Sequence, residues 1–434
     1  MLRFARNDRR ETVMPNYFRT KRVFYYLMIM LLAAAIVIGG GCARVRDADA
    51  VFSKTAELRE LSPESAMECQ FITPEELRER YTRIFEEEYS QEEAQIDQEV
   101  YVLLDLMGED QDLYTILLDV YSEQVIGFYD DESKELYVVS QKGELRPLEE
   151  VVLAHEYTHA LQDQYFDLGS LPLEEEDNSD LSIASLSLVE GDATLVQGIY
   201  MWTILNDNER EDLSQELEEF TSEAFDAAPR FIQENLTFPY ESGVSFVMAL
   251  FEQGGWEAID QAYSDLPQST EQILHTEKYL DERDEPQAIT MPNLQSALGT
   301  GWSQLDSDVL GELNIRIYLE TFVDEAEATT ATEGWDGDRY VYLKNTADKK
   351  LLVLHSVWDS VDDAKEFFNA YITFVEEKSQ GTWSLALDEE GKRWWQAEAV
   401  SLYLSQEGSE VLLIIAPDQV TTEEVLAEFP QFHA

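Results

Sequence analysis

The sequence predicts an α+β protein in which a mainly helical domain, residues 63–333, precedes a small α/β domain, residues 334–434. Three observations favour this fold class. Helical patterns with clear start signals dominate the first domain, and one β-hairpin pattern interrupts them at residues 125–140. Beyond Gly334 the pattern changes to β-rich runs around a single helix. Apolar residues make up 44% of the 434, enough to bury sizeable cores.

The charge of the chain restricts its partners. There are 30 Lys and Arg residues against 89 Asp and Glu, which gives a formal net charge of −59. Such a field repels phosphate backbones, so nucleic acid is excluded as a partner, and an anionic membrane surface is no docking site for the body of the protein. The two cysteines cannot form a dense disulfide framework.

The N-terminus departs from this acidic composition. Residues 1–22 carry seven basic and two acidic side chains, and residues 23–41 carry no charge at all. Nineteen apolar or small residues are long enough to cross a bilayer as one helix. Basic residues before such a segment stay in the cytoplasm. We therefore expect the rest of the chain outside the cytoplasm, held at the cell membrane through this segment only.

The end of the apolar segment allows two forms of tether. Gly39-Gly40-Gly41-Cys42 resembles a bacterial lipoprotein signal, in which the cysteine is lipidated after cleavage. The alternative is an uncleaved signal anchor, because the basic leader is long and Gly39 stands where a Leu-like residue is usual. An unlipidated Cys42 would be free to pair with Cys69. Residues 42–62 are expected to be a polar linker.

The main elements follow from local patterns. Thr73 offers a capping hydroxyl, Pro74 suits the first turn, and two glutamates follow near the positive end of the helix dipole. Pro147 with two glutamates opens a second helix in the same way. The expected elements of the first domain are helices from residue 73 to about 123, a hairpin at 125–140 turning at 130–134, a helix from 147 to about 168, an acidic loop at 174–180, a helix at 181–205, and mostly helical structure at 206–330. In the second domain, β-rich runs at 340–343, 351–357, 397–404 and 411–415 surround a helix at 361–377.

One motif carries chemistry. Residues 155–159, His-Glu-Tyr-Thr-His, form the pattern H-E-x-x-H. Positions four apart lie on one face of a helix, so His155 and His159 can bind one metal ion while Glu156 points towards its open position. Two neutral imidazoles plus an oxygen ligand suit Zn²⁺, which makes a bound water acidic enough to attack at neutral pH. Glu156 would accept the proton of that water and pass it to the leaving amine. The alternative is two histidines that only line a helix surface.

A zinc site of this kind needs a third protein ligand. Glu190 lies between apolar residues in LSLVEGDATLV, on a helix that must pack against another element. A buried carboxylate without a partner is costly, and a cation removes that cost. Gly191 beside it would permit close approach of a second helix. Asp192 is the rival ligand, or else an acceptor that holds a ligand imidazole; a salt-bridged structural Glu190 is the remaining alternative.

These segments resemble a known family. HEYTHALQDQYFDL, followed about thirty residues later by LVEGDAT, is similar to the gluzincins, the thermolysin-like zinc metallopeptidases. The resemblance covers residues 125–205 and implies a zincin-like catalytic domain whose ligands and general base are His155, His159, Glu190 and Glu156. It also implies that the hairpin supplies an edge strand, 135–140 or its partner strand, to which an extended peptide can add. The last hundred residues do not resemble the thermolysin C-terminal lobe.

Such enzymes also need a donor for the oxyanion of the tetrahedral intermediate, usually Tyr or His from the downstream lobe. Two candidates are present. His275 lies one helical turn before Tyr279, and Tyr240 follows Pro239 just before an expected helix. We prefer His275 because histidine is rare in this chain. His355, in a β-rich run, is expected in a core.

The expected function is a membrane-tethered, extracytoplasmic zinc metallopeptidase that hydrolyses peptide or protein substrates by a zinc-activated water, with Glu156 as general base. The alternative is a non-catalytic acidic surface lipoprotein that acts as a scaffold or peptide-binding module. An intact Glu156 argues against it, because a binding module has no need of that carboxylate. A third possibility, hydrolysis of cell-wall peptides, differs only in substrate.

Overall fold

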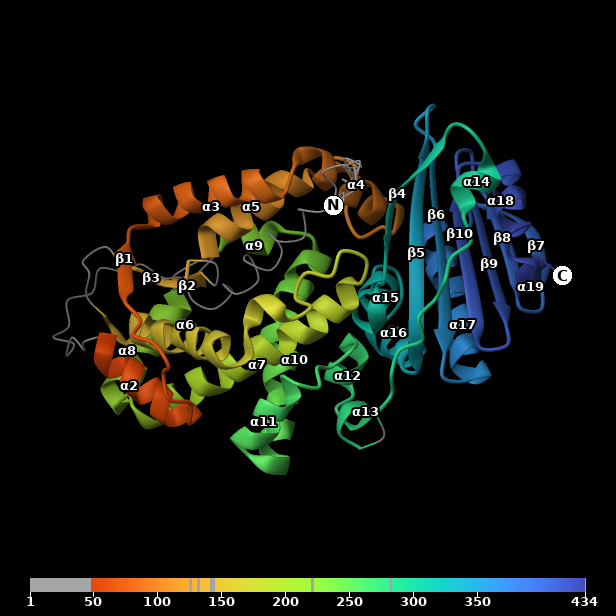
Figure 1. Cartoon of the computed structure of the whole chain (residues 1–434). Helices are drawn as coiled ribbons and strands as arrows, with labels where there is room; N and C mark the ends of the chain where they lie inside the picture. The colour runs from red at the N-terminus through yellow and green to blue at the C-terminus, as the bar shows by residue number, and fades with distance from the viewer. Residues whose placement is uncertain are drawn as a thin grey trace, which may run out of the picture.

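Figure 1 shows the computed structural model of the chain, which describes residues 48–124, 127–130, 133–140, 145–219, 222–281 and 283–433. The predictions for residues 1–22, residues 23–41 and Cys42 lie outside these ranges. None of the helices within them has both the length and the hydropathy needed to cross a bilayer. The protein is α+β, as predicted, with helices in the first part and a large sheet in the second.

The first part is mainly helical. Its helices are α2 (Ala48–Arg59), α3 (Pro74–Glu88), α4 (Gln91–Leu103), α5 (Leu113–Gln124), α6 (Pro147–Phe166), α7 (Ser179–Thr203), α8 (Asp207–Glu219), α9 (Glu223–Ala227), α10 (Arg230–Gly254), α11 (Trp256–Ala262), α12 (Thr270–Leu274), α13 (Glu277–Leu280) and α14 (Leu294–Leu298). The expected capping at Thr73 is present, since its side chain accepts from the backbone of Glu76 and the Glu76 carboxylate accepts from the backbone of Thr73. The two long helices predicted around the motif, α6 and α7, pack against each other.

A small three-stranded sheet covers α6. Its strands are β1 (Cys69–Ile72), β2 (Gly127–Asp130) and β3 (Glu135–Val139), in the order β1-β3-β2. The antiparallel hairpin of β2 and β3 agrees with the prediction. The edge strand needs a correction, because β1 pairs in parallel with β3 and makes it the central strand. Of the two strands considered, residues 135–140 are therefore not the edge; β2 is. Strand β1 lies more than sixty residues earlier in the chain, so the sequence of the hairpin does not predict that β1 pairs with it.

The second part is built on a seven-stranded antiparallel sheet in the order β4-β5-β6-β10-β9-β8-β7. The strands are β4 (Trp302–Asp308), β5 (Trp335–Asn345), β6 (Lys350–Trp358), β7 (Ser384–Glu389), β8 (Lys392–Gln396), β9 (Ser401–Glu407) and β10 (Glu410–Ala416). Its helices are α15 (Gly311–Glu320), α16 (Glu325–Thr332), α17 (Val361–Ser379), α18 (Gln419–Leu426) and α19 (Pro430–His433). Figure 1 shows this sheet as a layer beside the helical part.

Helices cover both faces of the large sheet. On β6, Leu352 and Leu354 belong to the core shared with α15, α16 and α17. The alternate residues Leu351 and Val353 pack with α14, α18 and α19. Successive strand residues point to opposite faces, so a strand buried on both sides becomes an uninterrupted apolar run. His355 lies in this strand and is buried against Phe429 and Phe432, as expected for a core residue.

The expected linker at residues 42–62 is only partly a linker. Residues 48–59 form α2, which packs on α6 and α7 and buries Val51, Phe52 and Arg59. The ring of Phe52 stacks on Tyr157 of the motif at a centroid distance of 4.2 Å. Three of the six apolar residues of this helix are alanines, and its packing face is completed by a buried arginine, so its composition predicts a polar segment.

The large sheet begins before residue 334. Strand β4 pairs with β5, and α15 and α16 contribute to the same core as α17. Polar residues fill most of β4, whose sequence is WSQLDSD, and no alternation marks it as a strand. Its pairing partner lies about thirty residues later, so only the folded chain identifies it.

Candidate metal centre

The motif residues converge with Glu190. Helix α6 places His155 and His159 one above the other, and α7 brings the Glu190 carboxylate against them. The two Nε2 atoms lie 3.1 Å apart, and Oε2 of Glu190 lies 3.1 Å from Nε2 of His155 and 3.5 Å from Nε2 of His159. His155 is 3% exposed, and the other two side chains are fully buried.

These three atoms fit a divalent cation. Zinc bonds of 2.0–2.2 Å in a tetrahedral site hold neighbouring ligand atoms about 3.3 Å apart, close to the three distances observed. Two imidazole nitrogens and a carboxylate oxygen also match the donor set of hydrolytic zinc sites. Oε1 of Glu190 and Nδ1 of His155 are buried without a hydrogen-bond partner among the described residues. A cation held among these atoms would compensate for part of the cost of that burial.

Burial and charge set the protonation of the site. Burial works against the charged form of His159, but attraction to Glu190 outweighs it and raises the imidazole pKa to about 9. Burial would raise the pKa of Glu190, and the two histidines reverse this and lower it. The His159–Glu190 pair is therefore held as imidazolium and carboxylate, and a cation bound here would displace that proton.

Glu156 lies beside the ligands and is 3% exposed. Its Oε2 accepts a hydrogen bond of 3.2 Å from the backbone N–H of Tyr129 in β2. Burial raises the pKa of this carboxyl to about 8, although His159 acts in the opposite direction. The edge strand of the small sheet and the expected general base are thus in direct contact.

Gln162 holds His159 in place. Its Oε1 lies 2.8 Å from Nδ1 of His159, and its Nε2 donates to the carbonyl oxygen of Val189 at 2.9 Å and to Oδ2 of Asp192 at 3.1 Å. Gln162 was not among the residues predicted from the sequence. Its position three residues after His159, on the same helix face, is the signal that would have found it.

Asp192 occupies the outer layer and does not reach the ligand set. Its Oδ1 accepts from Nε of Arg59 at 2.7 Å, and its Oδ2 accepts from the hydroxyl of Tyr263 at 3.0 Å. Arg59 is fully buried and also donates to Asp260. Of the two roles considered for Asp192, ligand or acceptor to a ligand imidazole, the structure shows neither directly: Gln162 stands between Asp192 and His159.

The two candidate oxyanion donors are placed differently. Tyr240 lies inside α10, which continues through Pro239 instead of beginning after it, and its ring centroid is 6.1 Å from that of His155. Phe238, Pro239 and Tyr240 are all buried in this helix. His275 instead pairs with Glu312 of α15, with Nε2 and Oε1 2.9 Å apart. The structure brings Tyr240, and not His275, next to the candidate ligands.

Close packing of α7 against α10 positions Tyr240. A Cβ built on Gly191 would lie 2.3 Å from the carbonyl oxygen of Gly243, and one on Gly243 would lie 2.3 Å from that of Ser187. The two backbones can approach to this distance only without side chains at both positions. The expected role of Gly191 in helix contact is confirmed, and the partner is the helix that carries Tyr240.

A second group of acidic residues does not form a comparable metal site. Glu271, Asp284 and Asp359 also have oxygens close enough to share an ion. The ammonium of Lys278 already lies among them, 2.6 Å from Glu271, 3.1 Å from Asp284 and 2.8 Å from Asp359. The lysine supplies the compensating charge, so this cluster is a structural ion-pair network.

Comparisons with known proteins concern the other part of the chain. One family model, described as a domain of unknown function (DUF8575), matches residues 299–426. This range holds the large sheet with α15 to α18 and contains none of the residues of the candidate metal centre. No curated protein and no solved structure matches the chain.

Proposed function

We propose that the protein is a zinc-dependent metallopeptidase, tethered to the cell membrane by its N-terminal segment with the catalytic part outside the cytoplasm. The observation that carries the proposal is the convergence of His155, His159 and Glu190, whose possible ligand atoms all lie within 4.8 Å of one another. The zincin-like nature of the helical part belongs to this proposal, and it is supported by the hairpin, the motif helix and the glutamate helix in the expected order.

Each residue of the site has its own proposed role. Zn²⁺ held by the three ligands would supply a Lewis acid that makes water acidic enough to attack a peptide carbonyl at neutral pH. Glu156 accepts the proton from the attacking water and delivers it to the leaving nitrogen. Tyr240 donates a hydrogen bond to the oxyanion that develops on the substrate carbonyl. The position of Tyr240 beside His155 makes it a better candidate for this role than His275.

Strand β2 would hold the substrate in an extended conformation. It is an edge of the small sheet, and an edge strand can pair with a peptide through main-chain hydrogen bonds. The hydrogen bond from the Tyr129 N–H to Glu156 supports this role, because it joins the strand to the proposed general base. A peptide added there would pass its backbone close to the ligand set.

The test uses the purified full-length protein, its metal content and a broad peptide library. We expect one zinc per chain, cleavage that is lost on chelation and restored by Zn²⁺, and a loss of about 10²- to 10⁴-fold in kcat/KM in the Glu156→Gln variant. That variant should keep its zinc, because Glu156 is not a ligand. Stoichiometric zinc without turnover on any peptide would favour the binding-module alternative. A protein without zinc affinity would overturn the proposal.

A further inference from the structure

Helix α2 supplies a fully buried arginine to the surroundings of the candidate metal centre. The buried residues of this helix, Val51, Phe52, Thr55 and Arg59, follow a helical spacing and form one packed face. The helix packs against both α6 and α7, which carry the three candidate ligands. Arginine is almost never fully buried unless its charge is paired. The pairing of Arg59 therefore indicates what the helix does in this position.

The guanidinium of Arg59 bridges two carboxylates. Its Nε donates to Oδ1 of Asp192 at 2.7 Å, and its Nη2 donates to Oδ1 of Asp260 at 2.6 Å. The group also lies over the ring of Trp256, 4.7 Å from the centroid. The side chains of Arg59 and Asp192 are both fully buried, whereas that of Asp260 is 38% exposed. Water can solvate Asp260 but not Asp192, so Asp192 depends on Arg59 for its compensating charge.

Asp192 transmits this constraint to the metal centre through Gln162. Its Oδ2 accepts from Nε2 of Gln162 at 3.1 Å and from the hydroxyl of Tyr263 at 3.0 Å. Because a carboxylate can only accept, Nε2 of Gln162 must face Asp192, and the amide oxygen must face His159, 2.8 Å from Nδ1. Three consecutive hydrogen bonds between buried side chains thus join Arg59 to a candidate ligand.

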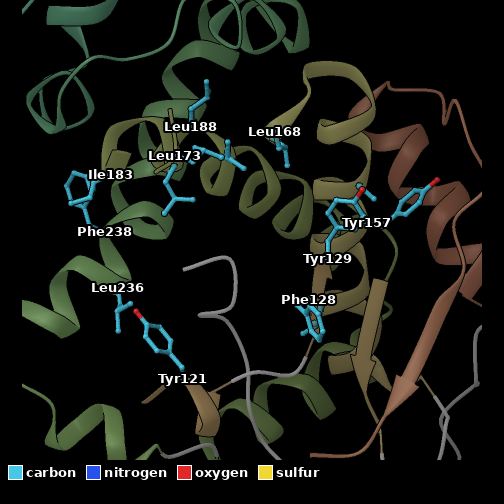
Figure 2. Packing of buried hydrophobic residues seen from close by; sticks show 14 of the residues in the cluster. Tyr121, Phe128, Tyr129, Tyr157, Leu168, Leu173, Ile183, Leu188, Leu236 and Phe238 are labelled. Carbon is cyan, nitrogen blue, oxygen red and sulfur yellow. The ribbon is translucent and has the colours of Figure 1, made fainter. Parts of the chain in front are cut away.

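Helix α2 contacts the motif helix at a second point. The ring of Phe52 stacks on Tyr157 at a centroid distance of 4.2 Å, and Tyr157 directly follows the proposed general base. Figure 2 shows Tyr157 on the side of α6 that faces α2. Phe52 and Arg59 are seven residues apart, about 10 Å along the helix axis. One end of α2 is therefore fixed against α6 and the other against α7.

We propose that Arg59 is a positioning residue for the metal centre, which holds the Gln162 amide, through Asp192, in the orientation that presents Nε2 of His159 to the cation. Arg59 contacts none of the three ligands and acts only through its partners. Without the guanidinium, the Asp192 carboxylate loses its compensating charge and one of its hydrogen bonds, and Gln162 loses a fixed acceptor. This inference rests on the proposed zinc site and makes α2 a structural part of it.

The test compares two substitutions that each remove one arm of the Arg59 contact. Arg59→Lys keeps the positive charge, but a single ammonium cannot reproduce the planar fork that reaches both carboxylates. Asp260→Asn removes the charge at the other arm and leaves the hydrogen bonds to His159 intact. The zinc affinity of each full-length protein is measured by competition with a chromophoric chelator, and the stability of the metal-free protein by urea unfolding.

The two variants should differ in zinc affinity. We expect both to be less stable than the wild type, but only Arg59→Lys to bind zinc more weakly, by about five- to tenfold, since direct partners of a ligand histidine contribute about 10- to 100-fold and Arg59 is further out. Asp192→Asn, which keeps the size of the side chain, should weaken affinity at least as much and replaces Arg59→Lys if that protein does not fold. Wild-type affinity in the folded variant, or equal losses in Arg59→Lys and Asp260→Asn, would overturn the proposal.

A double-mutant cycle separates positioning from a general effect on the fold. Gln162→Met removes the link between Asp192 and His159. If Arg59 acts through this link, adding Arg59→Lys to Gln162→Met should lower zinc affinity by less than about twofold further, although stability still falls. A further loss as large as in the wild-type background would show that Arg59 only supports the fold, and it would reject the positioning role.

This inference and the proposed peptidase function fail in different ways. A protein that binds zinc and shows the expected effect of Arg59→Lys, but cleaves no peptide, would retain the positioning role and reject the peptidase. A wild-type protein that binds zinc and cleaves peptides, with Arg59→Lys at wild-type affinity, would reject the positioning role alone. A wild-type protein without zinc affinity would overturn both.

Discussion

The amide of Gln162 decides which nitrogen of His159 faces the proposed cation. Its Nε2 donates to Val189 and Asp192, so its oxygen must face the imidazole. Because that oxygen can only accept, Nδ1 of His159 must be the donor in the 2.8 Å contact. The lone pair of the neutral ring is then on Nε2, the nitrogen nearest to Glu190. A single glutamine fixes both the tautomer and the ring orientation.

Replacing this glutamine should weaken metal binding without removing a ligand. We expect Gln162→Met to reduce zinc affinity about 10- to 100-fold, the usual cost of losing an outer hydrogen bond to a ligand histidine. The affinity is measured by competition with a chromophoric chelator. Gln164→Met is the control, because the Gln164 side chain accepts from the backbone of residues 64 and 65 instead. A folded Gln162→Met protein with wild-type affinity would contradict the assigned role.

The sequence predicted the residues of the inner site, but not the contacts that surround them. His155 and His159 share a helix face by spacing alone, and an acid among apolar residues stands out on any helix. Arg59 and Asp192 are 133 residues apart, and nothing near either residue indicates the other. The choice of Tyr240 over His275 depended on how α10 and α12 pack. The rarity of histidine in this chain gives no information about that packing.

At the scale of elements, the contact between α7 and α10 depends on two glycines and gives a sharp test. A methyl group on Gly191 would overlap the backbone of Gly243. We expect Gly191→Ala to destabilise the protein by about 3 kcal/mol and to weaken zinc binding, because α7 carries the neighbouring Glu190. Thermal and urea unfolding measure the first effect, and chelator competition measures the second.

Gly198 on the same helix provides the matched control. A Cβ at this position has no heavy atom within 4 Å. Alanine has the higher helix propensity, so Gly198→Ala should stabilise the protein by about 0.5–1 kcal/mol and leave zinc affinity unchanged. Similar effects of the two substitutions would show that helix propensity, and not the close approach of α10, governs position 191.

Elements with a strong local pattern were predictable, and those defined by distant pairing were not. The hairpin, α6, α7, α17 and the strands β5, β6, β9 and β10 each carry their own turn, cap or apolar run, whereas no predicted run covered β7 or β8. Strand β1 has four residues, and β4 is mostly polar, so each becomes a strand only when paired. Helix α10 contains a proline, a strong local stop signal, and tertiary packing overrides it.

At the scale of the whole molecule, acidic residues far outnumber the basic residues that could neutralise them in ion pairs. Residues 23–434 contain 23 Lys and Arg against 87 Asp and Glu, a net charge of −64. One-to-one pairing within these residues therefore leaves 64 carboxylate charges without a compensating base, and their mutual repulsion opposes the compact state. Some of the few cations lie in structural networks, as at Lys278 and Arg59, and others, such as Arg78 and Arg230, are exposed at the surface.

This imbalance predicts that stability depends on salt. The screening length falls from about 10 Å at 0.1 M to about 3 Å at 1 M, so repulsion between surface carboxylates is largely removed in molar salt. We expect the melting temperature of the full-length protein to rise by at least about 5 °C between 0.1 and 2 M NaCl, because relief of a few kcal/mol shifts a chain of this size by several degrees. Sucrose at matched osmolality is the control, since it favours compact states without screening charge. An equal rise in sucrose, or no rise in NaCl, would mean that the acidic surface serves solubility alone; a rise specific to salt would mark a protein adapted to a saline medium.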